Sequence, residues 1–256
     1  MASEKRAQTL KVAFLVCLVC SVVVSMVAVL LKPVVEKNRD REMRRNVLVA
    51  AGIYKKGMDI SAAFKSIEAL VIDLPAGVKR EDFSPDDYDL QEVLRNPALS
   101  DQLSSDNDPA QVRRIPRSAL VYLVKTADGQ LQKIILPIYG MGLWSTMRGF
   151  LALEADTRTI AGLTFYEHGE TPGLGGEIDN PRWQAQWTGK QAFDENWLPA
   201  ITVAMGKAMP VPDEFRVDGI SGATLTSRGV QNTVRFWLGE KTFGPFLARV
   251  RAGELQ

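Results

Sequence analysis

A short run of hydroxyl side chains and glycines at residues 218–226 carries the most distinctive chemistry in the chain. It reads Asp-Gly-Ile-Ser-Gly-Ala-Thr-Leu-Thr, so one carboxylate and three hydroxyl groups lie beside two glycines. A strand-like segment at 215–217 precedes it, and apolar residues recur after it at helical spacing up to Gly239. A turn between a strand and a helix N-terminus presents backbone N–H groups and a positive dipole end. This arrangement suits a phosphate.

The residues alone leave two other interpretations of this run. An ordinary glycine-rich turn, capped by a Ser or Thr, has the same composition. A hydrolase nucleophile elbow, G-x-S-x-G, is approached by residues 219–223, but Ala223 stands where the last glycine belongs. The one histidine of the chain, His168, precedes the serine, whereas that hydrolase order places the base after the nucleophile. The hydrolase interpretation is therefore disfavoured.

The run also resembles the flavinylation motif of the covalent FMN-binding domain family. That family includes the C subunit of the Na⁺-translocating NADH:quinone oxidoreductase and the G subunit of Rnf-type complexes. The resemblance rests on Ser-Gly-Ala-Thr preceded by Asp-Gly, on Glu-His-Gly-Glu-Thr-Pro-Gly-Leu-Gly at 167–175, and on one apolar N-terminal segment. It implies FMN joined by a phosphoester to Thr224. The other cofactor-binding residues expected in the run are Ser221, Gly222, Ala223 and Thr226, although Thr226 and Ser227 also suit capping of the following helix.

A flavin further needs a flat apolar slot for its ring. Two glycine-rich loops, at 140–145 and 171–176, are the expected walls. The cofactor-binding residues expected there are Trp144, Ser145, Glu170, Thr171, Leu174 and Gly175. From the residues alone, a core position for Trp144 is favoured and the turn at 171–175 needs no ligand. Only the resemblance favours the slot. Glu167, His168 and Glu170 either tune the protonation of the ring or belong to a surface loop.

An N-terminal run from Val12 to Leu31 contains 20 residues without a charge. At about 1.5 Å per residue it spans about 30 Å, the thickness of a bilayer's hydrocarbon core. The apolar region of a signal peptide is shorter, about 7–15 residues, and no small-residue cleavage pattern precedes Lys32. The run predicts one retained transmembrane helix. Cys17 and Cys20 lie inside it, where small polarizable residues in lipid are favoured over an incomplete redox or metal site.

The charges that flank this helix conflict with the resemblance. Three basic residues precede it, whereas six follow it up to Arg45. Counting them places the large domain in the cytoplasm. The resemblance implies a single-pass protein of the bacterial inner membrane with the large domain on the periplasmic side. We follow the resemblance, because large domains translocate largely regardless of charge.

The chain divides into four expected parts. They are a cytoplasmic N-terminus at 1–11, a transmembrane helix at 12–31, a helical and irregular membrane-proximal segment at 32–114, and an FMN-binding domain at 115–256. Expected elements are helices at 36–51, 61–71, 182–186 and 196–205, β-hairpins at 119–139 and 150–165, and an acidic solvated connection at 81–108. Strands followed by helices predict an α+β domain with a mostly antiparallel sheet and flanking helices.

Composition narrows the function. A formal net charge of +1 gives no sign of a nucleic-acid partner. No dinucleotide-binding fingerprint follows a strand, and neither a catalytic residue nor a metal site is expected.

The resemblance implies a membrane-anchored subunit that relays electrons through covalent FMN within the sodium-pumping complex. Its expected partners are the other membrane subunits and, during maturation, a flavin transferase. Asp218 either holds the turn or engages this transferase. The alternatives are the G subunit of an Rnf-type complex or a stand-alone anchored flavoprotein.

Overall fold

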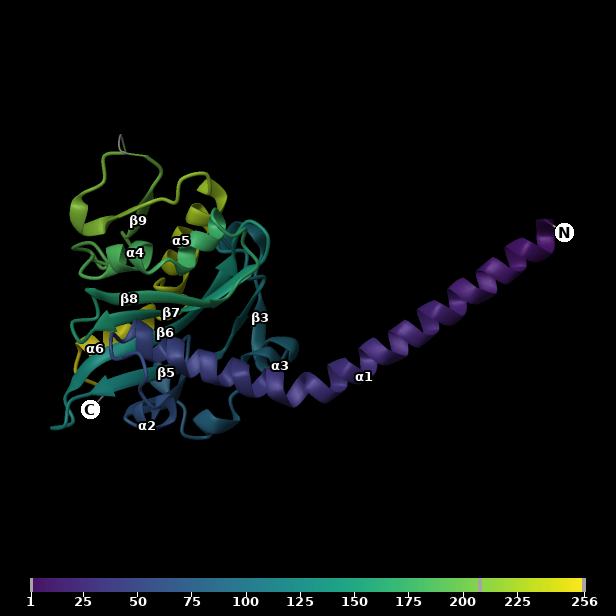
Figure 1. Cartoon of the computed structure of the whole chain (residues 1–256). Helices are drawn as coiled ribbons and strands as arrows, with labels where there is room; N and C mark the ends of the chain where they lie inside the picture. The colour runs from purple at the N-terminus through teal and green to yellow at the C-terminus, as the bar shows by residue number, and fades with distance from the viewer. Residues whose placement is uncertain (1, 207–208, 255–256) are drawn as a thin grey trace. The chain divides into compact units, whose positions relative to one another are not determined.

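The computed structural model describes residues 2–206 and 209–254, with side chains described from Gln8 onward. Contacts divide the chain into two units, Met1–Met43 and Arg44–Gln256. The first contains the N-terminal part of a long helix, α1 (Ala2–Ala50). The second is a domain that contains the last residues of this helix and the other described helices and strands (Figure 1).

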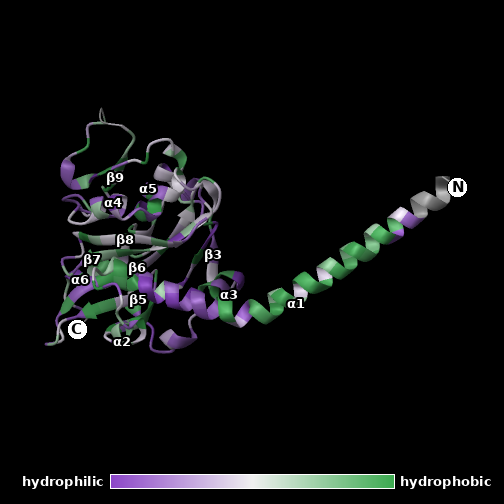
Figure 2. Cartoon of the chain, viewed as in Figure 1, coloured by the Kyte–Doolittle hydropathy of each residue, from purple (hydrophilic) through white to green (hydrophobic). Residues whose placement is uncertain are grey.

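Helix α1 is long and apolar enough to cross a membrane, with a mean hydropathy of 3.0 over its most apolar 18 residues. Figure 2 shows this stretch in green, followed by mainly hydrophilic residues. The predicted span Val12–Leu31 lies inside the helix with exposed side chains, and Pro33 does not interrupt it. Cys17 and Cys20 are free thiols on its surface. The predicted single N-terminal helix is confirmed, and the helix predicted at 36–51 is its continuation.

The domain is built on a six-stranded antiparallel sheet with the order β2-β1-β5-β6-β7-β8. Its strands are β1 (Ile67–Asp73), β2 (Val78–Lys79), β5 (Ser118–Lys125), β6 (Leu131–Met141), β7 (Thr146–Glu154) and β8 (Ile160–Glu167). Both predicted hairpins are confirmed, as β5–β6 and β7–β8. Gly129 in the first turn has a φ of 80°, which a side chain would strain. The expected α+β class with a mostly antiparallel sheet is confirmed.

The helix predicted at 61–71 is wrong. Asp59 does cap a helix, as expected, but that helix, α2 (Ile60–Phe64), ends after five residues. The next residues form β1, which pairs with β5 along its whole length. Strand β1 is buried on both faces at its centre, so its side chains form an apolar run that resembles a helix in sequence. The segment 32–114 therefore supplies strands to the main sheet.

The helix predicted at 196–205 is also wrong. Residues 194–198 form a turn, in which the Asp194 carboxylate accepts from the backbone N–H groups of Asn196 and Leu198. Pro199 then removes a helical donor. Strand β9 (Thr202–Ala204) follows and pairs in parallel with β10 (Arg216–Asp218). The helix predicted at 182–186 is confirmed as α4 (Pro181–Gln184) and a 3₁₀ turn.

Each face of the sheet packs against helices. On one face, every second residue of the strands is apolar, as in Ile134, Leu136 and Ile138 of β6. These side chains belong to the same core cluster as α5 (Thr224–Trp237) and α6 (Gly244–Arg251). On that face the indole N–H of Trp237 donates to the Tyr139 carbonyl at 2.6 Å. The other face meets the last turns of α1, where the Thr164 hydroxyl donates to the Asn46 carbonyl at 3.3 Å. Residues 44–51 are therefore part of the domain core.

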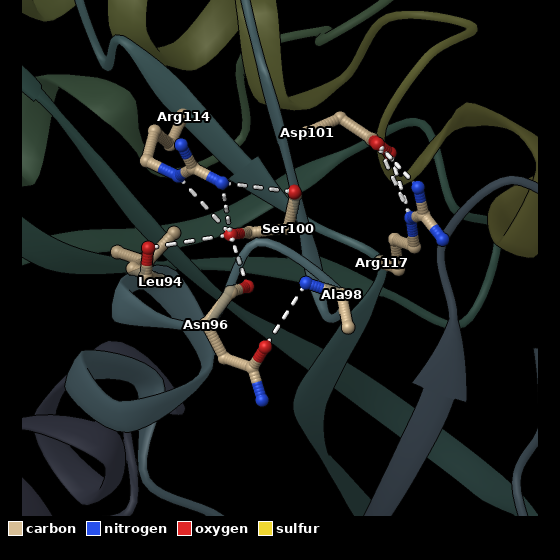
Figure 3. Close-up of polar contacts among 7 residues, drawn as sticks. All are labelled: Leu94, Asn96, Ala98, Ser100, Asp101, Arg114 and Arg117. Carbon is tan, nitrogen blue, oxygen red and sulfur yellow. Dashed lines mark hydrogen bonds and ion pairs between the residues drawn. The ribbon is translucent and has the colours of Figure 1, made fainter.

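The acidic stretch at 81–108 contains short ordered elements. They are α3 (Leu90–Arg95), β3 (Ser100–Gln102) with its partner β4 (Arg114–Pro116), and three-residue 3₁₀ turns at 85–87 and 105–107. Ser100 is 2 % exposed, and its hydroxyl lies 2.8 Å from the Asn96 carbonyl and 2.9 Å from the Arg114 guanidinium. Figure 3 draws both contacts. The carboxylate of Asp101 pairs with Arg117 at 2.7 Å. These bonds join the strand pair to the end of α3. In the described part of the chain, no group of acidic, His or Cys side chains is arranged to hold a metal ion.

Candidate functional site

The turn at 219–223 delivers the chain from β10 into helix α5. Gly222 has a φ of +76°, in the left-handed region that a glycine tolerates. The helix begins at Thr224, and Ala223 at its N-cap offers no side-chain acceptor. The first amide bonded into the helix is that of Ser227, which donates to the Ala223 carbonyl. Within the described residues, the amides of Thr224, Leu225 and Thr226 have no acceptor, so the helix N-terminus can bind an anion.

The hydroxyl groups of the run point in different directions. Ser221 and Thr224 are exposed, and their hydroxyls have no hydrogen-bond partner among the residues that the structure describes. Thr226 and Ser227 are 1 % and 0 % exposed. The Ser227 hydroxyl accepts from the Ile220 amide at 3.0 Å and ties the turn to the helix. The interpretation of Thr226 and Ser227 as helix caps is wrong, because the helix begins before them and turns both hydroxyls inward.

A buried carboxylate joins this helix to the two predicted loops. Glu170 is 5 % exposed, and its Oε2 accepts from the Thr226 hydroxyl at 2.5 Å and from the Leu143 amide at 3.1 Å. Its Oε1 accepts from the Trp144 amide at 2.9 Å. Two glycines make this approach possible. A Cβ at Gly142 would lie 2.5 Å from Oε1, and one at Gly175 would lie 2.5 Å from the Thr226 hydroxyl oxygen.

The environment of Glu170 favours its ionised form. Burial alone would raise its pKa, but hydrogen bonds from the Thr226 hydroxyl and from the amides of Trp144, Leu143 and Ser145 outweigh it. The pKa therefore lies below the usual value for a glutamate. Glu170 is thus a carboxylate at neutral pH, and its oxygens are occupied by donors of the protein itself.

Four large apolar side chains on the two loops and on the first turn of α5 are exposed. Leu143 and Trp144 are 40 % and 66 % exposed, Leu174 is 45 % and Leu225 is 54 % exposed. Leu174 lies against the turn, since a Cβ on Gly222 would be 3.0 Å from its Cδ2. The alternative of a core role for Trp144 is wrong. An apolar surface beside a free threonine hydroxyl and a helix N-terminus fits a ring with a phosphate tail.

The remaining predicted residues hold the loops. The Ser145 hydroxyl accepts from the Gly169 amide at 2.6 Å. His168 Nδ1 accepts from the Glu170 amide at 3.2 Å, and its Nε2 lies 2.7 Å from the Asp179 carboxylate. The carbonyl of Thr171, whose side chain is exposed, accepts from the amides of residues 174 and 176 and closes the turn.

Asp218 anchors the start of the run. Its carboxylate pairs with Arg216 at 3.0 Å. Its amide donates to the Gln186 side chain at 3.0 Å, and its carbonyl accepts from the Trp183 indole at 2.8 Å. These bonds fasten the end of β10 to the helical segment at 181–187. They support the interpretation that Asp218 holds the turn.

Comparison with known proteins agrees with this geometry. Residues 142–239 match the model of the FMN-binding domain family, a range that contains every predicted site residue. The fold and the site thus define a membrane-anchored FMN-binding protein. Among its relatives, the C subunit of the Na(+)-translocating NADH-quinone reductase from Yersinia pestis is 46 % identical over 268 residues, which cover 100 % of this chain and 99 % of that protein. The corresponding protein from Pseudomonas aeruginosa is 47 % identical, with 98 % of each chain covered.

Solved structures give the same result. The crystal structure of Shewanella oneidensis NqrC superposes with a TM-score of 0.77 at 37 % identity, over 85 % of this chain and 99 % of that chain. The C subunit from Parabacteroides distasonis superposes with a TM-score of 0.65 at 26 % identity. The chain belongs to the family of C subunits of the Na(+)-translocating NADH-quinone reductase, an oxidoreductase complex. The predicted family is confirmed, and this assignment is favoured over the G subunit of an Rnf-type complex.

Proposed function

We propose that this chain is the electron relay of a sodium-pumping NADH:quinone reductase and carries FMN on a phosphoester to Thr224. The observation that carries the proposal is the position of the Thr224 side chain. It is exposed at the first residue of α5, beside free amides and exposed apolar side chains, within the matched FMN-binding domain. The partners are the other membrane subunits and, during maturation, a flavin transferase.

The helix N-terminus suits the phosphate of this linkage. Esterification lowers the charge of a phosphate from about two negative charges to one. The amides of Leu225 and Thr226 and the helix dipole can hold that charge. A covalent bond also prevents loss of FMN from an open surface site on the periplasmic side, where no pool of free cofactor would replace it.

The exposed apolar side chains suit the ring. Leu174 lies against Gly222, just before Thr224 in the chain, so it can cover a ring moored at that residue. Trp144 and Leu143 extend from the loop that Glu170 holds. Bound FMN supplies one-electron transfer, while these side chains orient it, exclude water from part of it and tune its potential.

The mass of the intact protein tests the proposal. Made in a host with its flavin transferase, the chain is expected to gain the mass of FMN less one water, and made without the transferase it is expected to gain nothing. Purification in mild detergent is expected to bring several polytopic subunits with it. An unmodified mass in both hosts would contradict the proposal of covalent FMN. Purification of the chain without other subunits would favour a stand-alone flavoprotein.

Replacement of Trp144 by alanine tests the ring position. Trp144→Ala is expected to shift the visible absorption band or the potential of the flavin and to leave covalent attachment intact, because Trp144 lies in the loop joined to α5 and not at the attachment residue. Trp197→Ala is the matched control, since Trp197 is 39 % exposed but packs under Arg251 of α6. A wild-type spectrum and potential in Trp144→Ala would show that its indole does not contact the ring.

Protease accessibility tests the orientation in the membrane. If the domain lies on the periplasmic side, protease added to intact spheroplasts is expected to digest residues beyond Lys32. The charges around α1 alone predict the opposite result. The same treatment of inside-out vesicles provides the control, in which the domain is expected to survive. Survival in spheroplasts and digestion in inside-out vesicles would place the domain in the cytoplasm.

A further inference from the structure

One neighbouring segment holds the tip of loop 142–145 by hydrogen bonds. The amides of Leu143 and Trp144 donate to the Glu170 carboxylate, and the Ser145 hydroxyl accepts from the Gly169 amide. Within the described residues, these amides have no other acceptor. The loop that presents the exposed Leu143 and Trp144 side chains is thus fastened through residues 169–170.

The same carboxylate fastens the helix that bears Thr224. Glu170 Oε2 accepts from the Thr226 hydroxyl, which lies two residues beyond Thr224 in the first turn of α5. The glycines at 142 and 175 leave no room for a side chain between these groups. One buried carboxylate therefore sets the separation between the Trp144 loop and the first turn of α5.

We propose that Glu170 is a positioning residue that holds the ring-facing loop and the attachment helix in register, through the loop amides and the Thr226 hydroxyl, without touching the flavin. The inference rests on the proposed function, because it concerns the same flavin site. Glu170 acts before the flavin arrives, since its bonds are made by the protein alone. It gives the slot its shape in advance of attachment.

A carboxylate is needed at this position because every facing group from the loop is a donor. A glutamine has one acceptor oxygen and one NH₂ group, so in either orientation its NH₂ meets the amide N–H of Leu143 or Trp144. The Thr226 hydroxyl can reverse and accept, but a backbone amide cannot. An aspartate is one methylene shorter. Charge-assisted hydrogen bonds are also stronger than neutral ones, which offsets the burial of the charge.

Hydrogen exchange of the full chain in detergent, made without flavin transferase, tests the inference. In Glu170→Gln, amide exchange at residues 143–144 is expected to be faster by on the order of tenfold or more, because a charge-assisted bond is lost. Strands β6 and β7 are expected to exchange as in the wild type. Glu177→Gln is the matched control, because Glu177 accepts from Asn180 within its own turn. Its exchange at residues 143–144 is expected to be unchanged.

A second pair of variants covers the case in which Glu170→Gln does not fold. Thr226→Val removes the hydroxyl and is expected to speed exchange in the first turn of α5, whereas Thr226→Ser keeps the hydroxyl and is expected to match the wild type. Equal exchange in the Val and Ser variants would overturn the link through Thr226. Wild-type exchange at residues 143–144 in Glu170→Gln would overturn the link to the loop.

The flavin-loaded protein separates this inference from the proposed function. Made with the transferase, Glu170→Gln is expected to keep covalent flavin and to show a shifted visible absorption band. If the wild type carries no flavin, the proposed function fails, while the exchange result still decides the role of Glu170. If the wild type is loaded and both exchange and absorption of Glu170→Gln are unchanged, the positioning role is overturned and the proposed function stands.

Discussion

Thr224→Val is expected to carry no covalent flavin and to keep its fold. A phosphoester needs a hydroxyl at the modified residue, and valine has nearly the same volume without one. The Thr224 side chain is exposed, and its hydroxyl makes no hydrogen bond among the described residues, so its loss leaves no buried group unpaired. The measurement is in-gel flavin fluorescence after denaturing electrophoresis of protein made with its flavin transferase, in which the variant is expected to be dark.

The neighbouring hydroxyls provide the controls for this experiment. Thr226 is buried and donates to Glu170, and Ser227 is buried and accepts from Ile220, so neither is presented to a transferase. Thr226→Val is expected to remain fluorescent. Ser221 is the exposed rival, and Ser221→Ala is also expected to remain fluorescent. If Thr226→Val or Ser221→Ala lacks flavin fluorescence while Thr224→Val retains it, the attachment residue is Thr226 or Ser221 and not Thr224. If the wild type lacks fluorescence, the proposal of covalent flavin is contradicted.

The sequence predicted the elements in which local signals agree. Both hairpins combine apolar strand residues with a turn, and the first turn contains Asp128-Gly129. The helix after the motif is recognisable from its apolar spacing and from Gly239. The strand at 67–73 was missed because it is buried on both faces, and an apolar run of that length fits a helix or a strand. The pairing with β5 decided between them, and no local pattern contains that information.

The candidate site was likewise predicted only in part. Resemblance to a family selected Thr224 and the two loops, and the structure brings those segments together around Glu170. The contacts of Glu170 were not predictable, because they join residues 26, 27 and 56 positions apart in the chain. The closest sequence signal was the pair of glycines, Gly142 and Gly175, which indicate a close approach without naming the partner.

The second large effect is expected when the chain is shortened into the end of α1. A chain that begins at Lys32 is expected to be soluble and to unfold cooperatively, whereas one that begins at Ile53 is expected to aggregate. Residues 44–51 lie in the second unit, and Val47 and Leu48 within them are 0 % exposed. Each buried side chain of this size contributes about 1.5–3 kcal/mol. The two together are a large part of the about 5–15 kcal/mol that stabilises a typical domain.

Polar contacts add to this loss. Without residues 44–51, the Lys133 ammonium loses the Ala51 carbonyl at 2.8 Å and the Thr164 hydroxyl loses the Asn46 carbonyl. A chain that begins at Lys32 and carries Leu48→Ala isolates one contact, and its free energy of unfolding is expected to fall by about 2–5 kcal/mol. Gel filtration and thermal unfolding measure both effects. Equal melting temperatures for chains that begin at Lys32 and at Ile53 would show that the end of α1 is not part of the core, because removal of two fully buried side chains from a packed sheet face must lower the stability of that face.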